Sequence, residues 1–265
     1  AQTQFNDVGG VGNRLVEIII ANDGNDEQQA ATIAQKLASN QNILGVIGHN
    51  SSGSTKSALP EYEKADLAVI SATSTSTSIS SPVFFRTTPS DAIAGKKLAQ
   101  YTYNSKWNNR FIDNVAIFYN PSSPYSKSLQ QAFASHFEQL EGKVVASIDI
   151  SSPNFNPQRQ ISEIRGKVEA IALFPNTNLT SVAMGIIKAN TEVTGKKFLM
   201  VGGDALYTGD TIFNGGVAAK NLVLAVPWFS GGQNYAIQAQ KRWKGTVNWR
   251  TATSFDATLA LVNAL

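Results

Sequence analysis

The sequence predicts an α/β protein with two lobes, each a parallel sheet flanked by helices, joined by a hinge. Short apolar runs rich in β-branched residues alternate along the chain with segments of helical spacing. Most of these runs are continuous, which is typical of strands buried on both faces. A repeated strand–helix order indicates a parallel sheet covered by helices.

Two segments interrupt this alternation and have the composition of connections between lobes. The first, Tyr103–Asn114, is polar, and the second, Pro227–Gln233, is rich in Pro, Gly and Ser. If both are crossovers, residues 1–113 and 229–265 form lobe I and residues 114–228 form lobe II. A two-lobe protein of this kind is expected to bind its ligand between the lobes, at the carboxyl ends of the strands.

Eight apolar runs are expected to be strands because they are short, β-branched and bounded by polar or turn residues. In chain order they are Leu15–Ala21, Ile43–Gly48, Leu67–Ser71, Val115–Tyr119, Val144–Ile150, Val168–Phe174, Phe198–Val201 and Leu222–Val226.

The segments between these runs are expected to be helices because their apolar residues recur every three or four positions. They are Asp26–Ser39, Asp91–Tyr103, Ser126–Leu140, Ile161–Lys167, Leu179–Ala189 and Ala236–Lys244. The first begins with an acidic turn and the second with Ser90 or Asp91 as a cap. A further helix is expected around Ala58 and Tyr62.

The composition excludes several classes of function. Hydrophobic residues make up 42% of the 265 residues and charged residues 15%, which is typical of a globular protein. The net charge of +3 is small and scattered, so nucleic acid is not an expected partner. With no cysteine and two histidines, thiol chemistry and a multi-histidine metal site are excluded, and no cofactor is predicted. No apolar run reaches the ~20 residues of a membrane-spanning helix, and no signal peptide is visible.

A hydrolase would need one of the two histidines as its base. His49 lies two residues before Ser51, but the surrounding residues lack the Gly-x-Ser-x-Gly spacing of a nucleophile elbow. His136 falls within an expected helix, where a surface histidine is the simpler interpretation. The sequence therefore predicts a protein that is not an enzyme.

Two polar loops follow expected strands of the first lobe. In Gly48–Thr55, hydroxyls and free N–H groups at a helix start would suit an anion such as a carboxylate. The alternative is that Ser51 or Ser52 only caps the helix. In Ile70–Ser76, a carbonyl could accept from an ammonium and a hydroxyl could donate to a carboxylate. The alternative there is an ordinary solvated loop.

A third strand end presents an acid in the second lobe. Gly202 and Gly203 would allow a tight turn and a close approach, and Asp204 follows them. An acid facing an anion site is what a zwitterion requires. The alternative is that Asp204 caps the next helix.

The order and spacing of several motifs resemble those of the type I periplasmic binding proteins, and most closely the leucine/isoleucine/valine-binding group. The resemblance covers nearly all of the chain. The motifs are Gly9–Leu15, Asn22–Asp23, Glu27–Ser39, Val46–Gly48, Ile70–Thr73, Arg86–Asp91, Val115–Asn120, Pro124–Ser126, Gly202–Asp204, Trp249–Arg250 and Ser254–Ala257.

The resemblance implies a set of ligand-binding residues. Ser52 and Thr75 match the family's hydroxyls that hold the α-carboxylate of the ligand. The carbonyl of Thr73 and the acid of Asp204 would take the α-ammonium, and Tyr125 matches a tyrosine that closes over the ligand. The loop after Val168–Phe174 carries no firm assignment.

By this resemblance, the protein is expected to be periplasmic or extracellular. It would capture a small amino acid, neutral or branched-chain, by closing its lobes, and deliver it to the membrane permease of an ABC transporter. One alternative is the ligand-sensing domain of a receptor, fused to a signalling domain. Another is a relative that binds a sugar or an amide. The pair Asp204 and Ser52 favours a zwitterion, because sugar sites usually stack aromatic rings on the ligand.

The chain departs from the family pattern at both ends. Of the strand and long helix that precede the Gly-Gly-Val-Gly loop, only Ala1–Asn6 matches, and at the other end the family continues past Leu265 through further strands. This departure predicts an exposed apolar edge or face in an incomplete lobe I, which would favour self-association.

Overall fold

The computed structural model describes residues 2–192, 197–232 and 234–265. Ala1, in the expected lobe I, and Gln233, at the end of the second expected connection, therefore lie outside the described residues. Contacts divide the chain into two compact units, unit 1 (Ala1–Pro89 with Trp228–Leu265) and unit 2 (Ser90–Pro227). The first boundary falls earlier than the expected residue 113. The reason is that helix α4 (Asp91–Asn104) packs closely on helix α5 (Pro124–Gln139) within unit 2.

Unit 2 contains a five-stranded sheet whose strands are all parallel, as the strand–helix order predicts. Its order is β10-β9-β8-β6-β7. The strands are β6 (Asn114–Tyr119), β7 (Lys143–Asp149), β8 (Ala170–Phe174), β9 (Leu199–Gly202) and β10 (Leu222–Leu224). The chain leaves β6 to one side for β7 and then returns to the other side for β8. The carboxyl ends of β6 and β8 therefore form the crevice where α/β sheets bind ligands.

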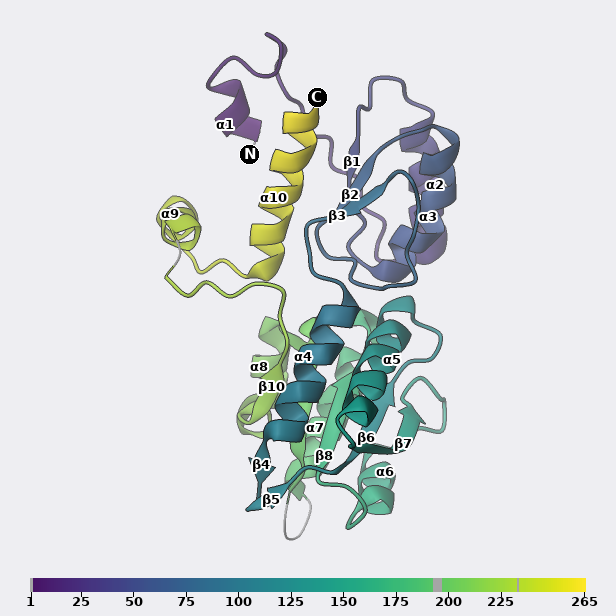
Figure 1. Ribbon diagram of the computed structural model, residues 1–265. Coiled ribbons are helices and arrows are strands. Elements are labelled where there is room, and N and C mark those ends of the chain that lie inside the picture. The colour runs from purple at the N-terminus through teal and green to yellow at the C-terminus, as the bar shows by residue number, and fades with distance from the viewer. Residues whose placement is uncertain (1, 193–196, 233) are drawn as a thin grey trace. The chain divides into compact units, whose positions relative to one another are not determined.

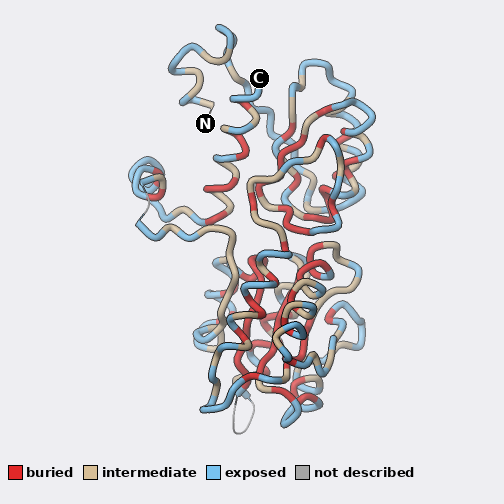
Figure 2. The backbone as a smooth tube through the Cα atoms, viewed as in Figure 1, coloured by how far each residue is buried: buried red, intermediate tan, exposed pale blue. Residues whose placement is uncertain are grey.

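The central strands of this sheet, β6, β8 and β9, are buried on both faces. Val115 and Ile117 of β6 join the core under α4 and α5, whereas Ala116 and Phe118 join the core on the opposite face. That opposite face is covered by α6 (Pro157–Ile164) and α7 (Thr180–Glu192). Figure 2 shows the buried strands enclosed by helices. Continuous apolar runs are required here because successive side chains point into two different cores.

Unit 1 has a smaller parallel sheet of order β1-β2-β3, formed by Val46–Ile47, Val69–Ser71 and Phe84–Arg86. Helices α2 (Glu27–Ala38) and α3 (Ser52–Lys64) pack together and cover one face. Helix α10 (Trp249–Ala264) contacts β1 and β2 through the second core cluster of this unit. The unit also contains α1 (Gln2–Asn6) and α9 (Asn234–Trp243), which Figure 1 labels with the other elements.

The prediction of a strand at Leu15–Ala21 is wrong, because no residue of this run belongs to a strand. Its backbone is bonded by side chains instead of a neighbouring strand. Asn6 Oδ1 accepts from the N–H of Val16 at 2.8 Å, and Gln2 Oε1 accepts from the N–H of Ile18 at 3.1 Å. The apolar side chains of the run are left exposed, Ile20 to 92%.

Three short strands were not expected from the sequence. β3 has three residues, of which Phe85 is exposed, so it lacks the continuous apolar pattern of the other strands. β4 (Lys106–Trp107) and β5 (Arg110–Phe111) form an antiparallel pair inside the segment expected to be a linker. Asn108 and Asn109, which connect the pair, both have positive φ, a conformation that asparagine tolerates.

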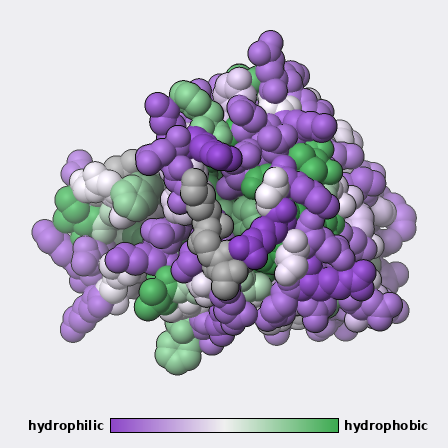
Figure 3. Space-filling view, turned by 90° about the horizontal axis from the view of Figure 1, so that it is seen from below, coloured by the Kyte–Doolittle hydropathy of each residue, from purple (hydrophilic) through white to green (hydrophobic). Residues whose placement is uncertain are grey.

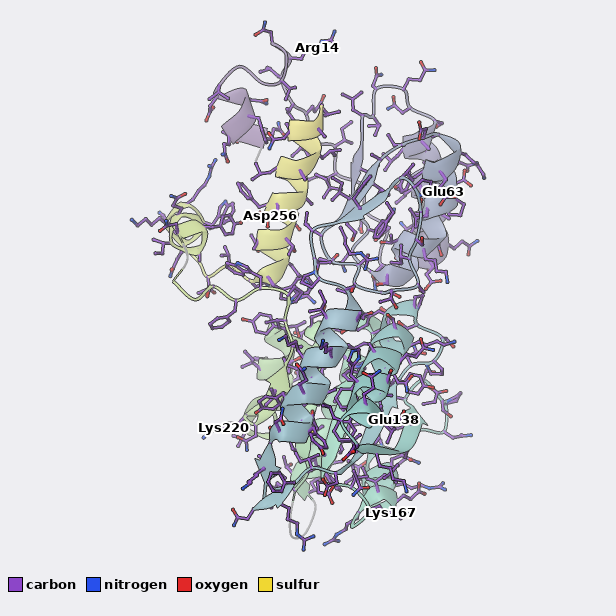
Figure 4. The ribbon with its side chains drawn as sticks, in the orientation of Figure 1. Arg14, Glu63, Glu138, Lys167, Lys220 and Asp256 are labelled. Atoms are coloured by element: carbon purple, nitrogen blue, oxygen red, sulfur yellow. The ribbon has the colours of Figure 1, made fainter. Side chains whose placement is uncertain are left out.

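The outer surface carries charged side chains and also exposed hydrophobic ones, such as Phe213 and Val217. Glu63 of α3, Glu138 of α5 and Lys220 are exposed residues, and Figure 4 labels them on the ribbon. On the face seen in Figure 3, hydrophobic side chains form small groups separated by hydrophilic ones. None of the helices in the described ranges is long and apolar enough to cross a membrane.

Candidate functional site

In the loop after β1, the two serines that sequence analysis considered as helix caps have different roles. Ser51 is the N-cap of α3, and its hydroxyl accepts from the N–H of Ser54 at 3.1 Å. Ser52 is the first residue of the helix, is 2% exposed, and accepts from the N–H of Ser76 at 3.2 Å. Because Ser51 caps the helix, Ser52 is available to connect this loop to the one after β2.

Several hydroxyls further join these two loops. Thr73 donates from Oγ1 to the carbonyl of Asn50 at 2.7 Å, and Thr55 and Ser74 share a bond of 2.6 Å between their hydroxyls. The loop after β2 is therefore an ordered part of unit 1, unlike the solvated loop considered as its alternative. Ser52, Thr73 and Thr75 lie in the two joined loops.

Thr75 differs from its neighbours. Its side chain is 3% exposed, and its Oγ1 has no hydrogen-bond partner among the described residues. A buried hydroxyl without a partner costs about 1–3 kcal/mol. Two other buried groups of unit 1, Thr88 Oγ1 and Trp249 Nε1, share this property.

Arg86 supports the loop after β2 from β3. Its guanidinium donates to the carbonyls of Ser74 at 3.2 Å and Ser76 at 3.0 Å, on either side of Thr75. It also lies over the ring of Phe84, with Cζ 5.0 Å from the ring centroid. These bonds place a positive charge behind a loop that offers hydroxyl donors, which favours an anion there.

In unit 2, Tyr125 and Asp204 are bonded to each other. Tyr125, in the first turn of α5, donates from its hydroxyl to Asp204 Oδ1 at 2.9 Å. The same hydroxyl accepts from the N–H of Ala205 at 3.3 Å. Tyr125 is 9% exposed and Asp204 is 7% exposed. The sequence predicted both as ligand residues but did not predict this bond.

Asp204 does not have the capping role considered as its alternative. The short helix Asp204–Leu206 has Gly203 as its N-cap, without a side-chain hydrogen bond. The next helix, α8 (Gly209–Gly215), is capped by Thr208, whose side chain accepts from Thr211. The carboxylate of Asp204 is therefore directed by Tyr125 and not by a helix start.

The close approach expected at the two glycines is made by Tyr125. A Cβ added to Gly203 would collide with the Tyr125 hydroxyl and with Leu129. Gly203 has a φ of −87°, so glycine is needed there for space and not for backbone conformation. A larger residue would push Tyr125 away from Asp204.

The phenol of Tyr125 is held in its protonated form. Burial raises the pKa of Tyr125 well above its ordinary value of 10.0, and the charges of Asp204 and Asp91 raise it further. Asp91, the first residue of α4, is fully buried. With its proton retained at physiological pH, Tyr125 serves as a donor to the carboxylate of Asp204.

Sequence analysis missed three polar residues at the crevice between β6 and β8. Asn120 follows β6, and its Nδ2 donates to Oδ1 of Asn176, beyond the end of β8, at 3.1 Å. Ser126 accepts from the N–H of Asn120 at 2.7 Å and donates to the carbonyl of Phe174. The signal was available, because both asparagines lie just beyond the ends of adjacent parallel strands.

The predicted residues thus fall into two groups, one in each unit. The group in unit 1 offers hydroxyl donors beside an arginine, and the group in unit 2 offers a buried carboxylate held by a phenol. The first is chemically suited to a carboxylate and the second to a cation. In the described part of the chain, no three His, Asp or Glu residues are arranged to hold a metal ion.

The amino-acid sequence matches a known protein family. The protein family described as "Periplasmic binding protein" matches residues 1–265. The leucine-, isoleucine-, valine-, threonine- and alanine-binding protein of Pseudomonas aeruginosa is 22% identical over 231 residues. That match covers 84% of this chain and 58% of the relative, so the chain spans somewhat more than half the length of this relative.

Solved structures share the fold. The branched-chain amino acid transporter substrate-binding protein of Streptococcus pneumoniae, solved with isoleucine, has a TM-score of 0.82 at 20% identity, over 98% of this chain and 75% of that one. A solute-binding protein of an ABC transporter from Rhodopseudomonas palustris, solved with 3,4-dihydroxybenzoic acid, has a TM-score of 0.77 at 17% identity, over 98% and 72%. At these identities the likeness establishes the fold alone.

Proposed function

This chain belongs to the periplasmic binding protein family, and from that premise we propose that it is the extracytoplasmic solute-binding component of an ABC transporter. We further propose that its solute is a small neutral amino acid. The family is one of binding proteins, in agreement with the prediction that the chain is not an enzyme.

The observation that carries the proposal is the buried hydroxyl of Thr75. A carboxylate supplies the acceptor that this hydroxyl lacks among the described residues, and Ser52, whose hydroxyl accepts from Ser76, can donate to the same group. Arg86 adds a positive charge behind the loop. Hydrogen bonds from hydroxyls to an ionised group are about twice as strong as those between neutral groups.

The choice of an amino acid over an aromatic acid rests on Asp204. A hydroxybenzoate has no cation to offer a buried carboxylate, whereas an amino acid has its α-ammonium. A buried carboxylate that faces a ligand without a cation loses water and gains no opposite charge, which costs free energy. The relative from Pseudomonas aeruginosa, named for five neutral amino acids, supports the same choice.

The predicted residues would then supply partners for both charges of the solute. Ser52 and Thr75 would hold the α-carboxylate, Asp204 and the Thr73 carbonyl would hold the α-ammonium, and Tyr125 would keep Asp204 in place. Solution X-ray scattering with and without solute would test whether binding is accompanied by the closure that the sequence analysis expects.

A ligand panel tests the proposal. Wild-type protein is heated with each of L-leucine, L-isoleucine, L-valine, L-threonine, L-alanine, 4-hydroxybenzoate, 3,4-dihydroxybenzoate and glucose. A ligand at 100 times its Kd stabilises the folded state by about 2.7 kcal/mol, which raises the Tm by several degrees. We expect shifts with the neutral amino acids. Shifts confined to the aromatic acids would assign the second ligand class seen among the solved structures, and shifts with glucose alone would assign the sugar alternative.

The same panel does not distinguish a transporter component from a sensor, because a receptor domain on this fold would bind the same solute. Reconstitution of the chain with an ABC transporter permease separates them. Solute-dependent transport into vesicles is expected for the transporter component, and its absence with a solute-binding chain would favour the sensor.

A further inference from the structure

His49 belongs to the first of the two hydroxyl loops and was not among the predicted binding residues. Its carbonyl oxygen accepts from the hydroxyl of Ser71 at 3.0 Å and from that of Ser74 at 3.1 Å. Thr55 and Thr73 lie farther from it, at 3.4 Å and 3.5 Å, and their hydroxyls have shorter bonds to Ser74 and to the carbonyl of Asn50. The carbonyl of His49, in the loop after β1, thus holds two hydroxyls at the end of β2 and in the loop that follows it, so its position sets how the two loops meet.

The bond network continues from these hydroxyls to the loop backbone. The hydroxyl of Ser71 accepts from the N–H of Ser74 at 2.9 Å and from that of Thr73 at 3.3 Å. Thr75 directly follows Ser74, whose hydroxyl bonds the His49 carbonyl, so the position of the Thr75 backbone depends on that carbonyl. A displacement of that carbonyl would release Ser71 and Ser74 and would move Thr75 with them.

The ring of His49 is held at both nitrogens. Nδ1 lies 2.7 Å from Asp23 Oδ2, and Nε2 lies 3.0 Å from the hydroxyl of Tyr62. His49 is 8% exposed and Tyr62 is fully buried. An ionised Asp23 only accepts, so Nδ1 carries a proton, and a neutral ring then accepts from Tyr62 at Nε2.

Burial, and then the charge of Asp23, raise the pKa of Tyr62 well above its ordinary value of 10.0, which keeps the phenol a donor. Asp23 precedes α2, Tyr62 belongs to α3, and His49 follows β1. The three side chains therefore connect three separate segments at the base of the two loops. A ring bonded at both ends cannot turn or slide without losing a buried hydrogen bond.

We propose that Asp23, His49 and Tyr62 form a positioning network that fixes the two hydroxyl loops for a carboxylate. The inference rests on the proposed function, and it adds three residues that do not themselves touch the solute. Their part is to hold the His49 peptide, and through it Ser52 and Thr75, in the geometry that the carboxylate needs. A displacement of 1 Å at such a site is enough to weaken binding strongly.

The test compares L-leucine with L-leucinamide, which keeps the α-ammonium and the side chain but replaces the carboxylate with a neutral amide. Asp23→Ala removes the acceptor for His49 Nδ1. We expect this variant to bind leucine at least 10-fold more weakly than wild type does. Its affinity for leucinamide should fall by a smaller factor, less than half of the factor measured for leucine. Asp23→Asn keeps an acceptor oxygen, so we expect it to restore most of the loss.

Asn190→Ala is the matched control. Asn190 is buried in unit 2 and bonds the backbone of Phe198 at 3.0 Å and 3.1 Å, so its loss lowers stability away from both loops. We expect Asn190→Ala to lower the Tm and to leave the ratio of the two affinities unchanged. Tyr62→Phe, which removes a single oxygen atom, tests the other end of the network if Asp23→Ala does not fold.

The outcomes separate the inference from the proposed function. If wild type binds no amino acid, the proposed function is wrong. If wild type binds leucine and folded Asp23→Ala binds it equally well, the positioning network is wrong. The network is also wrong if Asp23→Ala loses affinity for leucine and leucinamide by the same factor, because that result describes a general loss of structure.

Discussion

The hydroxyl of Tyr125 donates a 2.9 Å hydrogen bond to the carboxylate of Asp204, and this bond joins the start of α5 to the end of β9. It explains two features of the sequence together. Gly203 must be small because the Tyr125 hydroxyl lies against it, and Asp204 is buried without serving as a helix cap. The carboxylate is held in one orientation before any solute binds, which lowers the cost of binding.

Asp204→Asn tests whether this carboxylate binds the α-ammonium. The amide is nearly the same size and still accepts from Tyr125, so the Tm should change little. Loss of one partner of a buried charge pair costs about 2–5 kcal/mol, so we expect affinity for L-leucine to fall at least 30-fold. Isothermal titration calorimetry measures the affinity.

The exposed Glu138 of the same unit gives the control, since Glu138→Gln makes the same chemical change on the surface. Its affinity for L-leucine should match wild type. Equal affinities for Asp204→Asn and Glu138→Gln would remove Asp204 from the site.

Thr75→Val tests the carboxylate side and has an unusual expected signature. Valine replaces a buried hydroxyl that has no partner among the described residues, so the free protein should be as stable as wild type or more stable. Affinity for L-leucine should nevertheless fall by about 10-fold, as a hydrogen bond to a charged group is lost. Urea unfolding and calorimetry measure the two effects.

Thr102→Val is the matched change in unit 2. The Thr102 hydroxyl is buried but donates to the carbonyl of Leu98 at 2.8 Å. We expect this variant to lose stability and to keep its affinity. A loss of stability without a loss of affinity in Thr75→Val would show that this hydroxyl serves the fold.

Alkaline pH should destabilise the protein through its buried phenols. The folded-state pKa of Tyr125 is raised well above 10, whereas the unfolded chain releases this proton near pH 10. The stabilisation is fully present below pH 10 and is lost as the pH rises toward the folded pKa, by up to about 1.4 kcal/mol per pH unit. Tyr125→Phe should reduce this slope, as urea unfolding between pH 9 and pH 11 would measure. A slope equal to that of the exposed-site variant Tyr101→Phe would contradict the account.

The apolar run Leu15–Ala21 should favour self-association. Leu15, Ile19 and Ile20 are 73%, 60% and 92% exposed, and the run belongs to no strand. Exposed apolar runs with unpaired backbone tend to pair with other chains. Sedimentation velocity over a range of concentrations should show association that Ile19→Lys with Ile20→Lys abolishes. Identical concentration dependence in wild type and the double variant would refute this role.

The sequence was sufficient for the parts of the fold that depend on local pattern. The buried strands of the unit 2 sheet, such as β8, are continuous apolar runs because they are covered on both faces, and α2 begins with the acidic turn at Asp26 and Glu27 that its sequence indicates. The run Leu15–Ala21 shows the limit of this reasoning. Its β-branched composition is that of a strand, but a strand also needs a neighbour, and composition does not supply one.

The candidate site was predictable as residue types at strand ends, and not as a network. Strand ends in parallel sheets carry binding residues, which indicated the two loops and Asp204, whereas Ser52 and Thr75 were chosen within those loops by resemblance to the family. The bonds of His49 could not be foreseen, because Asp23, His49 and Tyr62 are brought together only by folding. Only the coordinates distinguish Ser51, which caps α3, from Ser52, which does not.

The preference of the wild-type protein between L-leucine and 4-methylpentanoate tests the central claim most directly. The two molecules share the carboxylate and the branched side chain, and differ in the α-ammonium. If Asp204 binds that ammonium, calorimetry should give at least 30-fold tighter binding of leucine, which corresponds to about 2 kcal/mol. Equal affinities, or tighter binding of 4-methylpentanoate, would contradict the assignment of an amino acid and would favour a simple carboxylic acid as the solute.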